Sequence, residues 1–123
     1  MNDTPFTAID HLQLAMPAGE ENTARKFFRD LLGMAELPKP AELAERGGCW
    51  FQSGAVQIHI GVDKDFHPAA KAHPALRCRN YAKLLARLHQ AGITVRDAIE
   101  LPGTTRCHIL DPWGNRIELI ADK

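Results

Sequence analysis

Apolar and polar residues alternate along two segments of the first half, a pattern that predicts strands with one buried face. In segment 9–16 the large apolar side chains after Ile9 occupy even positions, whereas His11 and Gln13 occupy odd ones. Segment 55–62 is apolar at every even position and carries His59 on the opposite face. Each of these predicted strands therefore points a histidine away from the core.

A different spacing predicts two amphipathic helices. Between positions 20 and 32, apolar residues recur every three or four positions, which places them on one face of a helix. Gly33 follows, and glycine is common just beyond the end of a helix. In the second half, Asn80 can cap a helix that runs to about position 90, where Gly92 ends it.

Turn residues divide the rest of the chain. Segment 106–121 is interpreted as two strands joined by a tight turn, because residues 111–115 combine Pro and Gly. A Ser-Gly pair at 53–54 predicts a hairpin. Residues 38–46 are interpreted as a loop or a single helical turn, and 63–72 as a connector. Further strands are predicted at 34–37, 47–52, 73–79 and 93–96.

The order of one strand, one helix and three strands thus occurs twice. Equivalent residues lie 59 to 62 positions apart, as His11 with His73, Gly33 with Gly92, and His59 with Glu118. A unit of this size cannot bury an open sheet face by itself, so two units are expected to pair, within a chain or between chains. The sequence predicts a single α+β domain of two βαβββ modules, at about 7–62 and 73–121, whose curved mixed sheets surround a concave cleft.

A residue able to bind metal recurs on the polar face of the first and last strand of each module. These candidate metal ligands are His11, His59, His73 and Glu118. If equivalent strands lie side by side, the four side chains can converge on one divalent ion. Nitrogen and oxygen donors of this kind suit Fe, Ni, Co, Mn or Zn rather than Ca. Glu118 needs a partner because burying a lone carboxylate is prohibitively unfavourable, and Arg77 or Arg116 is the alternative to a metal.

Other polar residues share these faces and are candidate substrate contacts. They are Gln13, Trp50, Gln57, Arg77, Arg106 and His108. His108 could instead pair with Asp111. Glu118 and His59 are the candidate catalytic residues, because a carboxylate or imidazole beside the reacting centre can move a proton.

Composition narrows the classes of partner. Fifteen basic residues balance fifteen acidic ones among 123. This charge balance and the absence of a basic run argue against nucleic acid or an anionic membrane surface as a binding partner. Three cysteines without a CxxC motif favour reduced thiols. No apolar run reaches the roughly 18 residues of a membrane helix. We expect a cytoplasmic protein that acts on a small molecule.

Several motifs carry a family resemblance. They are the repeated βαβββ unit, Ile-Asp-His-Leu at 9–12, Phe-Phe-Arg-Asp-Leu-Leu-Gly at 27–33, and Asp-Pro-Trp-Gly-Asn-Arg-Ile-Glu-Leu-Ile at 111–120. Together they cover nearly the whole chain. In these motifs the sequence resembles the vicinal oxygen chelate superfamily. This superfamily includes glyoxalase I, fosfomycin and bleomycin resistance proteins and extradiol dioxygenases.

The resemblance implies a glyoxalase-like fold and a homodimer. In metal-binding members the ligands lie on the first and last strands of the modules, which here carry His11, His59, His73 and Glu118. It further implies a divalent metal that acts as a Lewis acid on a small substrate with vicinal oxygens, in isomerase or lyase chemistry.

Two alternatives stay open. Glyoxalase I commonly has Glu where this chain has His59, so the resemblance does not secure lactoylglutathione lyase activity. His11, His73 and Glu118 alone form a two-His-one-carboxylate set, which suits an Fe(II)-dependent extradiol-type dioxygenase. Some superfamily members bind no metal, so the second alternative is a non-catalytic binding or resistance protein.

Overall fold

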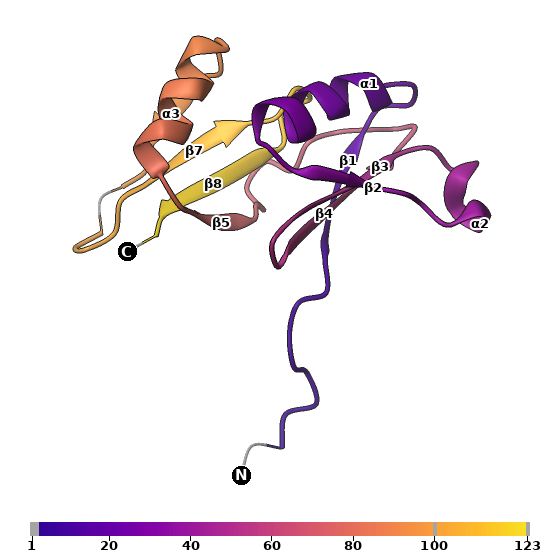
Figure 1. Cartoon of the computed structure of the whole chain (residues 1–123), viewed down its shortest axis with the longest axis horizontal. Coiled ribbons are helices and arrows are strands. Elements are labelled where there is room, and N and C mark those ends of the chain that lie inside the picture. The colour runs from indigo at the N-terminus through magenta and orange to yellow at the C-terminus, as the bar shows by residue number, and fades with distance from the viewer. Residues whose placement is uncertain (1–2, 100, 123) are drawn as a thin grey trace.

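Two four-stranded sheets, each built from one half of the chain, lie side by side in a computed structural model that describes residues 3–99 and 101–122 (Figure 1). The first sheet has the order β1-β4-β3-β2, and the second has the order β5-β8-β7-β6. The strands of the first are β1 (Leu12–Met16), β2 (Ala35–Leu37), β3 (Cys49–Ser53) and β4 (Val56–Val62). Those of the second are β5 (Ala75–Cys78), β6 (Val95–Asp97), β7 (Arg106–Leu110) and β8 (Arg116–Ala121).

The pairing within each sheet repeats. The first strand of each half runs parallel to the last, β1 with β4 and β5 with β8, and the remaining pairs are antiparallel. A parallel neighbour needs a crossover connection, which the helix and the intervening strands provide. The predicted α+β architecture of two mixed sheets is confirmed.

The predicted helix at 20–32 is present but is not a uniform α-helix. A short α1 (Glu21–Ala24) continues into η1 (Arg25–Leu31), a stretch of π-helix that buries Phe27 and Phe28. At its end the Leu32 amide donates to the Phe27 carbonyl at 2.9 Å, five residues back. Gly33 then takes a φ of +77°, as expected of a residue that ends a helix.

The second half carries α3 (Tyr81–Gln90), as predicted. Asn80 stands at its N-cap position with a φ of +52°, but its side chain makes no capping hydrogen bond. Capping by the Asn80 side chain was therefore a wrong expectation, and its tolerance of left-handed backbone is the property used. The segment at 38–46 contains one short helix, α2 (Ala41–Ala44).

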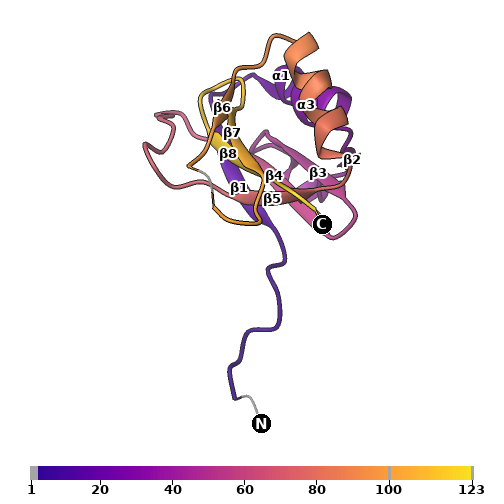
Figure 2. The same ribbon diagram turned by 90° about the vertical axis from the view of Figure 1, so that its left-hand side faces the viewer.

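Helices α1 and α3 cover the same side of the molecule, and both views place them next to each other (Figures 1 and 2). Beneath them lies the core, whose largest fully buried side chains include Phe28, Phe51, Met16, Ile58, Leu88, Ile109 and Ile117. The strand residues of this core have the parity that the alternation predicts. The polar residues of the same strands consequently occupy the opposite faces of the sheets.

The first strand of each half begins later than predicted. The parallel ladders begin at Leu12, paired with Ile58, and at Ala75, paired with Glu118. His11 and His73 therefore precede β1 and β5 rather than lying within them. The hairpin between β3 and β4 turns through Gly54 and Ala55, one residue later than predicted, since Ser53 pairs with Val56.

The two halves contact each other at the turn between β7 and β8. The Asn115 side-chain amide donates to the Ala15 carbonyl at 2.8 Å. The Trp113 indole N–H donates to Glu20 at 3.2 Å. From α3, Arg87 donates to the Leu31 carbonyl at 3.0 Å.

Three further observations concern the whole chain. The cysteines Cys49, Cys78 and Cys107 are free thiols. Among the residues that the structure describes, no helix is both long and apolar enough to cross a membrane. Residues 3–10 leave the sheets as an extended segment that forms no helix or strand (Figure 2).

Candidate functional site

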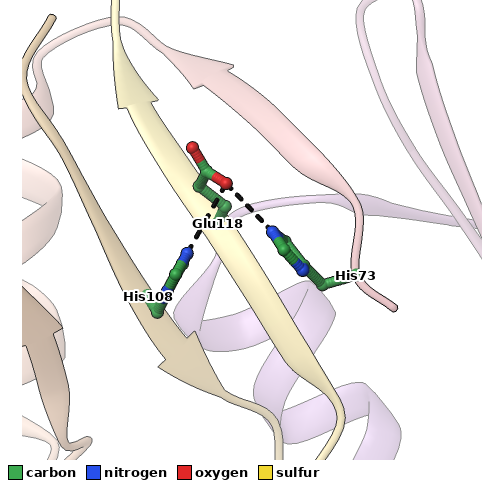
Figure 3. Close-up of side chains that lie close together, drawn as sticks. All are labelled: His73, His108 and Glu118. Carbon is green, nitrogen blue, oxygen red and sulfur yellow. Dashed lines mark hydrogen bonds and ion pairs between the residues drawn. The ribbon is translucent and has the colours of Figure 1, made fainter. Parts of the chain in front are cut away.

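Three candidate ligands converge on the polar face of the second sheet. His108 and Glu118 are direct partners in the β7–β8 register, and His73 lies beside them just before β5 (Figure 3). One donor atom from each residue lies within 4.8 Å of the others. The His73 Nε2 lies 3.0 Å, and the His108 Nε2 3.5 Å, from the same carboxylate oxygen, Glu118 Oε1.

Glu118 is only 7% exposed, and its second carboxylate oxygen, Oε2, contacts the guanidinium of Arg106. Arg106 donates from Nη1 to Glu118 Oε2 at 3.1 Å and from Nη2 to the Ile99 carbonyl at 2.8 Å. Burial by itself raises the pKa of Glu118, but the hydrogen bonds from His73 and Arg106 and the Arg106 charge outweigh it. The pKa of Glu118 consequently lies below its ordinary value, and the carboxylate is charged at neutral pH.

Two buried nitrogens beside Glu118, Arg106 Nε and His108 Nε2, have no hydrogen-bond partner among the residues that the structure describes. A buried polar atom without a partner is unfavourable and rare in native proteins. His108 Nε2 is near enough to Glu118 for an ion pair, although it does not meet the criteria of a hydrogen bond. The unpartnered imidazole nitrogen of His108 lies close to a second imidazole, His73, and to the Glu118 carboxylate. This set of donors fits a divalent metal ion.

The first sheet holds the other two candidate ligands in a stack of rings. His59 lies between His11, at a centroid distance of 3.9 Å, and Trp50, at 4.1 Å. The carboxylate of Asp10 lies 2.8 Å from His11 Nδ1, an arrangement that fixes the imidazole and leaves Nε2 for another contact. His59 Nε2 lies 2.7 Å from Gln57 Oε1.

His59 is buried, and this burial lowers its pKa, with the neighbouring His11 adding to the effect. A lowered pKa keeps the imidazole neutral at physiological pH, and the neutral form is the one that binds metals. The stack borders a hollow of about 590 Å³ whose lining includes Gln13 and Gln57.

Lys39 and Arg46 also line this hollow, although the sequence pattern did not select them. They lie on either side of α2, in a segment without periodicity. The Lys39 ammonium donates to the Gly47 carbonyl, which holds it at the rim. Two cations here suit a substrate that carries an anionic group.

The structure thus divides the predicted ligands into two pairs. His73 and Glu118 meet on the second sheet with His108, and His11 meets His59 on the first. Among the described residues, His11 and His59 do not belong to the three-donor cluster. Sharing of one ion by all four stays a prediction.

The predicted substrate contacts also divide. Gln13, Trp50 and Gln57 surround the His59 stack, whereas Arg106 and His108 belong to the Glu118 cluster. Arg77, in β5, is the register partner of Ile120 in β8 and borders a separate hollow between the two halves. The role of His108 as a cluster member could have been found from the sequence, because it faces Glu118 across the turn at 111–115.

Comparison with known proteins identifies the family. The model of the Glyoxalase/Bleomycin resistance protein/Dioxygenase superfamily matches residues 8–119. A glyoxalase family protein from Bacillus anthracis is 44% identical over 100% of both chains, with a TM-score of 0.93. A search of the curated proteins finds no match.

Two more distant structures share the fold. The fosfomycin resistance protein FosX from Listeria monocytogenes is 14% identical, with a TM-score of 0.74 over 96% of this chain and 95% of its own. A lactoylglutathione lyase from Agrobacterium tumefaciens is 20% identical, with a TM-score of 0.68 over 96% of both chains. From the repeated sheets, the family match and the 44% identical relative, this chain belongs to the Glyoxalase/Bleomycin resistance protein/Dioxygenase superfamily.

Proposed function

We propose that the protein is a metalloenzyme that uses a divalent metal as a Lewis acid on a small substrate with vicinal oxygens, in an isomerase or lyase reaction. The observation that carries this proposal is the meeting of His73, His108 and Glu118 within 4.8 Å. A divalent ion held there would polarise a substrate oxygen and stabilise negative charge as it develops.

We further propose that the complete site lies between two chains of a homodimer. The second sheet offers His73 and Glu118, and the first offers the stacked His11 and His59. Each pair lies on the face of its sheet that the helices leave uncovered. Pairing the second half of one chain with the first half of another would bring the four side chains together, with Fe, Ni, Co, Mn or Zn as the ion.

The roles of the protein's own groups follow from their surroundings. Glu118 is charged and borders the reacting centre, so its carboxylate can accept a proton from a substrate carbon and return it to a neighbouring one. His59 is neutral and can serve the same purpose from the opposite sheet. Arg106, Lys39 and Arg46 would neutralise an anionic substrate group, and the Trp50 ring would pack against its apolar part.

An Fe(II)-dependent extradiol-type dioxygenase is the second candidate. It is favoured by the composition of the cluster, because two histidines and one carboxylate are the set that leaves coordination positions open for a substrate and O₂. In that case His11 and His59 would contact the substrate rather than the ion.

Metal analysis tests the proposal. The purified protein, stripped and then supplied in turn with each of the five metals, should bind one ion per site. His11→Ala and Glu118→Ala should each reduce metal affinity at least about tenfold, because mutating even an outer-shell partner of a ligand costs that much. His89→Ala, which removes an exposed histidine on α3, is the matched control and should bind as the wild type does.

Activity separates the candidates. The loaded protein is assayed with hemithioacetals of 2-oxoaldehydes, with fosfomycin and with catechols. Turnover of a hemithioacetal or of fosfomycin supports Lewis-acid chemistry, and ring cleavage of a catechol with Fe(II) supports the dioxygenase. If no metal binds stoichiometrically after reconstitution, the metalloenzyme proposal is wrong and a non-catalytic binding protein is the better description.

A further inference from the structure

The N-terminal arm, residues 3–10, carries apolar side chains into solvent. It leaves the sheets below β1 in both views (Figures 1 and 2), and each of its residues is exposed. Phe6 is 86% exposed and Ile9 is 84% exposed. Solvation of two large apolar groups on an extended arm is unfavourable, and a covering surface would remove that penalty.

A second pair of exposed apolar side chains lies between β6 and β7. Ile99 is 83% exposed and Leu101 is 50% exposed. Within residues 3–99 and 101–122, these two and the arm residues Phe6 and Ile9 are the large hydrophobic side chains with high exposure. The chain therefore presents two apolar surfaces, one on the arm and one on the segment around Ile99.

Both surfaces are connected to the candidate metal site. The arm leads directly into His11, whose ring stacks on His59. The carbonyl of Ile99 accepts a hydrogen bond from Arg106, and Arg106 donates to Glu118. If His11 of one chain faces Glu118 of another, the arm that precedes His11 and the segment whose Ile99 carbonyl binds Arg106 both border the shared site.

We infer that the arm of each chain docks on a second copy of this chain, with Phe6 and Ile9 covering Ile99 and Leu101. The inference rests on the shared metal site proposed above. It adds that the docked arm covers this site. In a two-fold dimer the contact forms twice, because each chain supplies one arm and one docking segment. The arm then shields Arg106 and Glu118 from water and fixes the carbonyl that orients Arg106.

Directed cross-linking tests the docking in the full-length, metal-loaded protein. Chains with Phe6→Cys are mixed with chains of a different length that carry Ile99→Cys, both in a Cys78→Ser background that removes the partly exposed native thiol. A covalent heterodimer should form under mild oxidation. Lys64→Cys, an exposed position in the connector, replaces Phe6→Cys in the control and should give at least about tenfold less product.

Dimer stability provides the second measurement. The double variant Phe6→Ser/Ile9→Ser should raise the dimer dissociation constant at least about tenfold, because each arm loses two buried apolar groups. Phe6→Leu/Ile9→Leu keeps the apolar character and should retain dimerisation. Sedimentation at several protein concentrations measures both.

The outcomes distinguish this inference from the proposed function. A protein that dimerises and binds metal, but whose cross-link equals the control and whose serine variant dissociates like the wild type, overturns the docking alone. A metal-loaded protein that stays monomeric overturns both the docking and the shared site. A specific cross-link with a weakened serine variant supports the inference.

Discussion

Glu118 is the residue whose charge most affects the site. His73 and Arg106 hold its pKa below the ordinary value, so the folded protein binds fewer protons than the unfolded chain at acidic pH. The stabilisation is therefore complete above the ordinary carboxyl pKa of 4.5 and is lost as pH falls through the lower, folded value.

Replacing this carboxylate should reveal the pH dependence. In metal-free protein, Glu118→Gln should lower the free energy of unfolding by about 1–3 kcal/mol at pH 7, because Arg106 and His73 lose their charged partner. The difference from the wild type should shrink as pH falls below 4.5. Urea unfolding at several pH values, with chelator present, measures it. A difference that is constant with pH would contradict the assigned charge.

At the residue scale, the sequence predicted which side chains face away from the core but not what they contact. The alternation in β4 and β8 was sufficient to place His59 and Glu118 on the sheet faces opposite the core. The stacking of His59 between His11 and Trp50 depends on ring orientation and cross-strand register, neither of which a single strand pattern contains.

At the scale of elements, the junction of α1 with the first sheet depends on one glycine. Gly48 has a φ of +91°, and its amide donates to the Glu21 carboxylate at 2.8 Å. This hydrogen bond is the main reason that the pKa of Glu21 is lowered. A Cβ at position 48 would also collide with the backbone oxygen of Ile60.

Two alanine substitutions form a matched pair, one at Gly48 just before β3 and one at Gly61 within β4. Gly48→Ala should destabilise the protein by about 3 kcal/mol or more, because the left-handed backbone and the collision with backbone act together. Gly61→Ala meets only the flexible, exposed Gln13 side chain and should change stability by less than about 1 kcal/mol. Thermal unfolding compares them. Similar losses in both variants would refute this account of Gly48.

The β7–β8 turn is the second element with a defined energetic role. Asn115 is buried and donates both to the Ala15 carbonyl at 2.8 Å and to Asp111 Oδ2 at 2.7 Å. Asn115→Ala should lower stability by about 1–3 kcal/mol, since buried acceptors lose their donor. Asn22→Ala, on the exposed face of α1, should change it by less than about 0.5 kcal/mol. Denaturant unfolding of both variants measures the contrast.

Elements were predicted well where periodicity or turn chemistry is strong. Both long helices and the two strands that flank the Asp-Pro-Trp-Gly-Asn turn lie where the pattern placed them. The π-helix was missed because Phe27, Phe28 and Leu31 keep a spacing that an α-helix also satisfies. The strands starting at Leu12 and Ala75 are shorter than predicted, because alternation continues beyond the residues that have a partner.

At the scale of the whole molecule, the location of the site within or between chains can be tested by complementation. His11→Ala and Glu118→Ala chains are co-expressed, so that mixed dimers form. If one site uses the first half of one chain and the second half of the other, each mixed dimer has one intact site. Random mixing should then restore metal binding to about one quarter of the wild-type level.

The result for a site within one chain is different. Every chain would then lack a ligand, and mixing would restore nothing beyond the level of the separate variants. Co-expression of His89→Ala with Glu118→Ala controls for expression and should give intermediate binding in either case. The sequence could not decide between these arrangements, because a repeat predicts that halves pair but not which halves.

The pairing of strands within halves also has a consequence for biosynthesis. All strands of the first sheet precede residue 63, so this sheet can form while the second half is still being translated. The hydrogen bond from Asn115 to Ala15 spans 100 positions and can form only once Asn115 has left the ribosome. We therefore expect the nascent protein to form its first sheet early, and to join its two halves only after the second half has emerged.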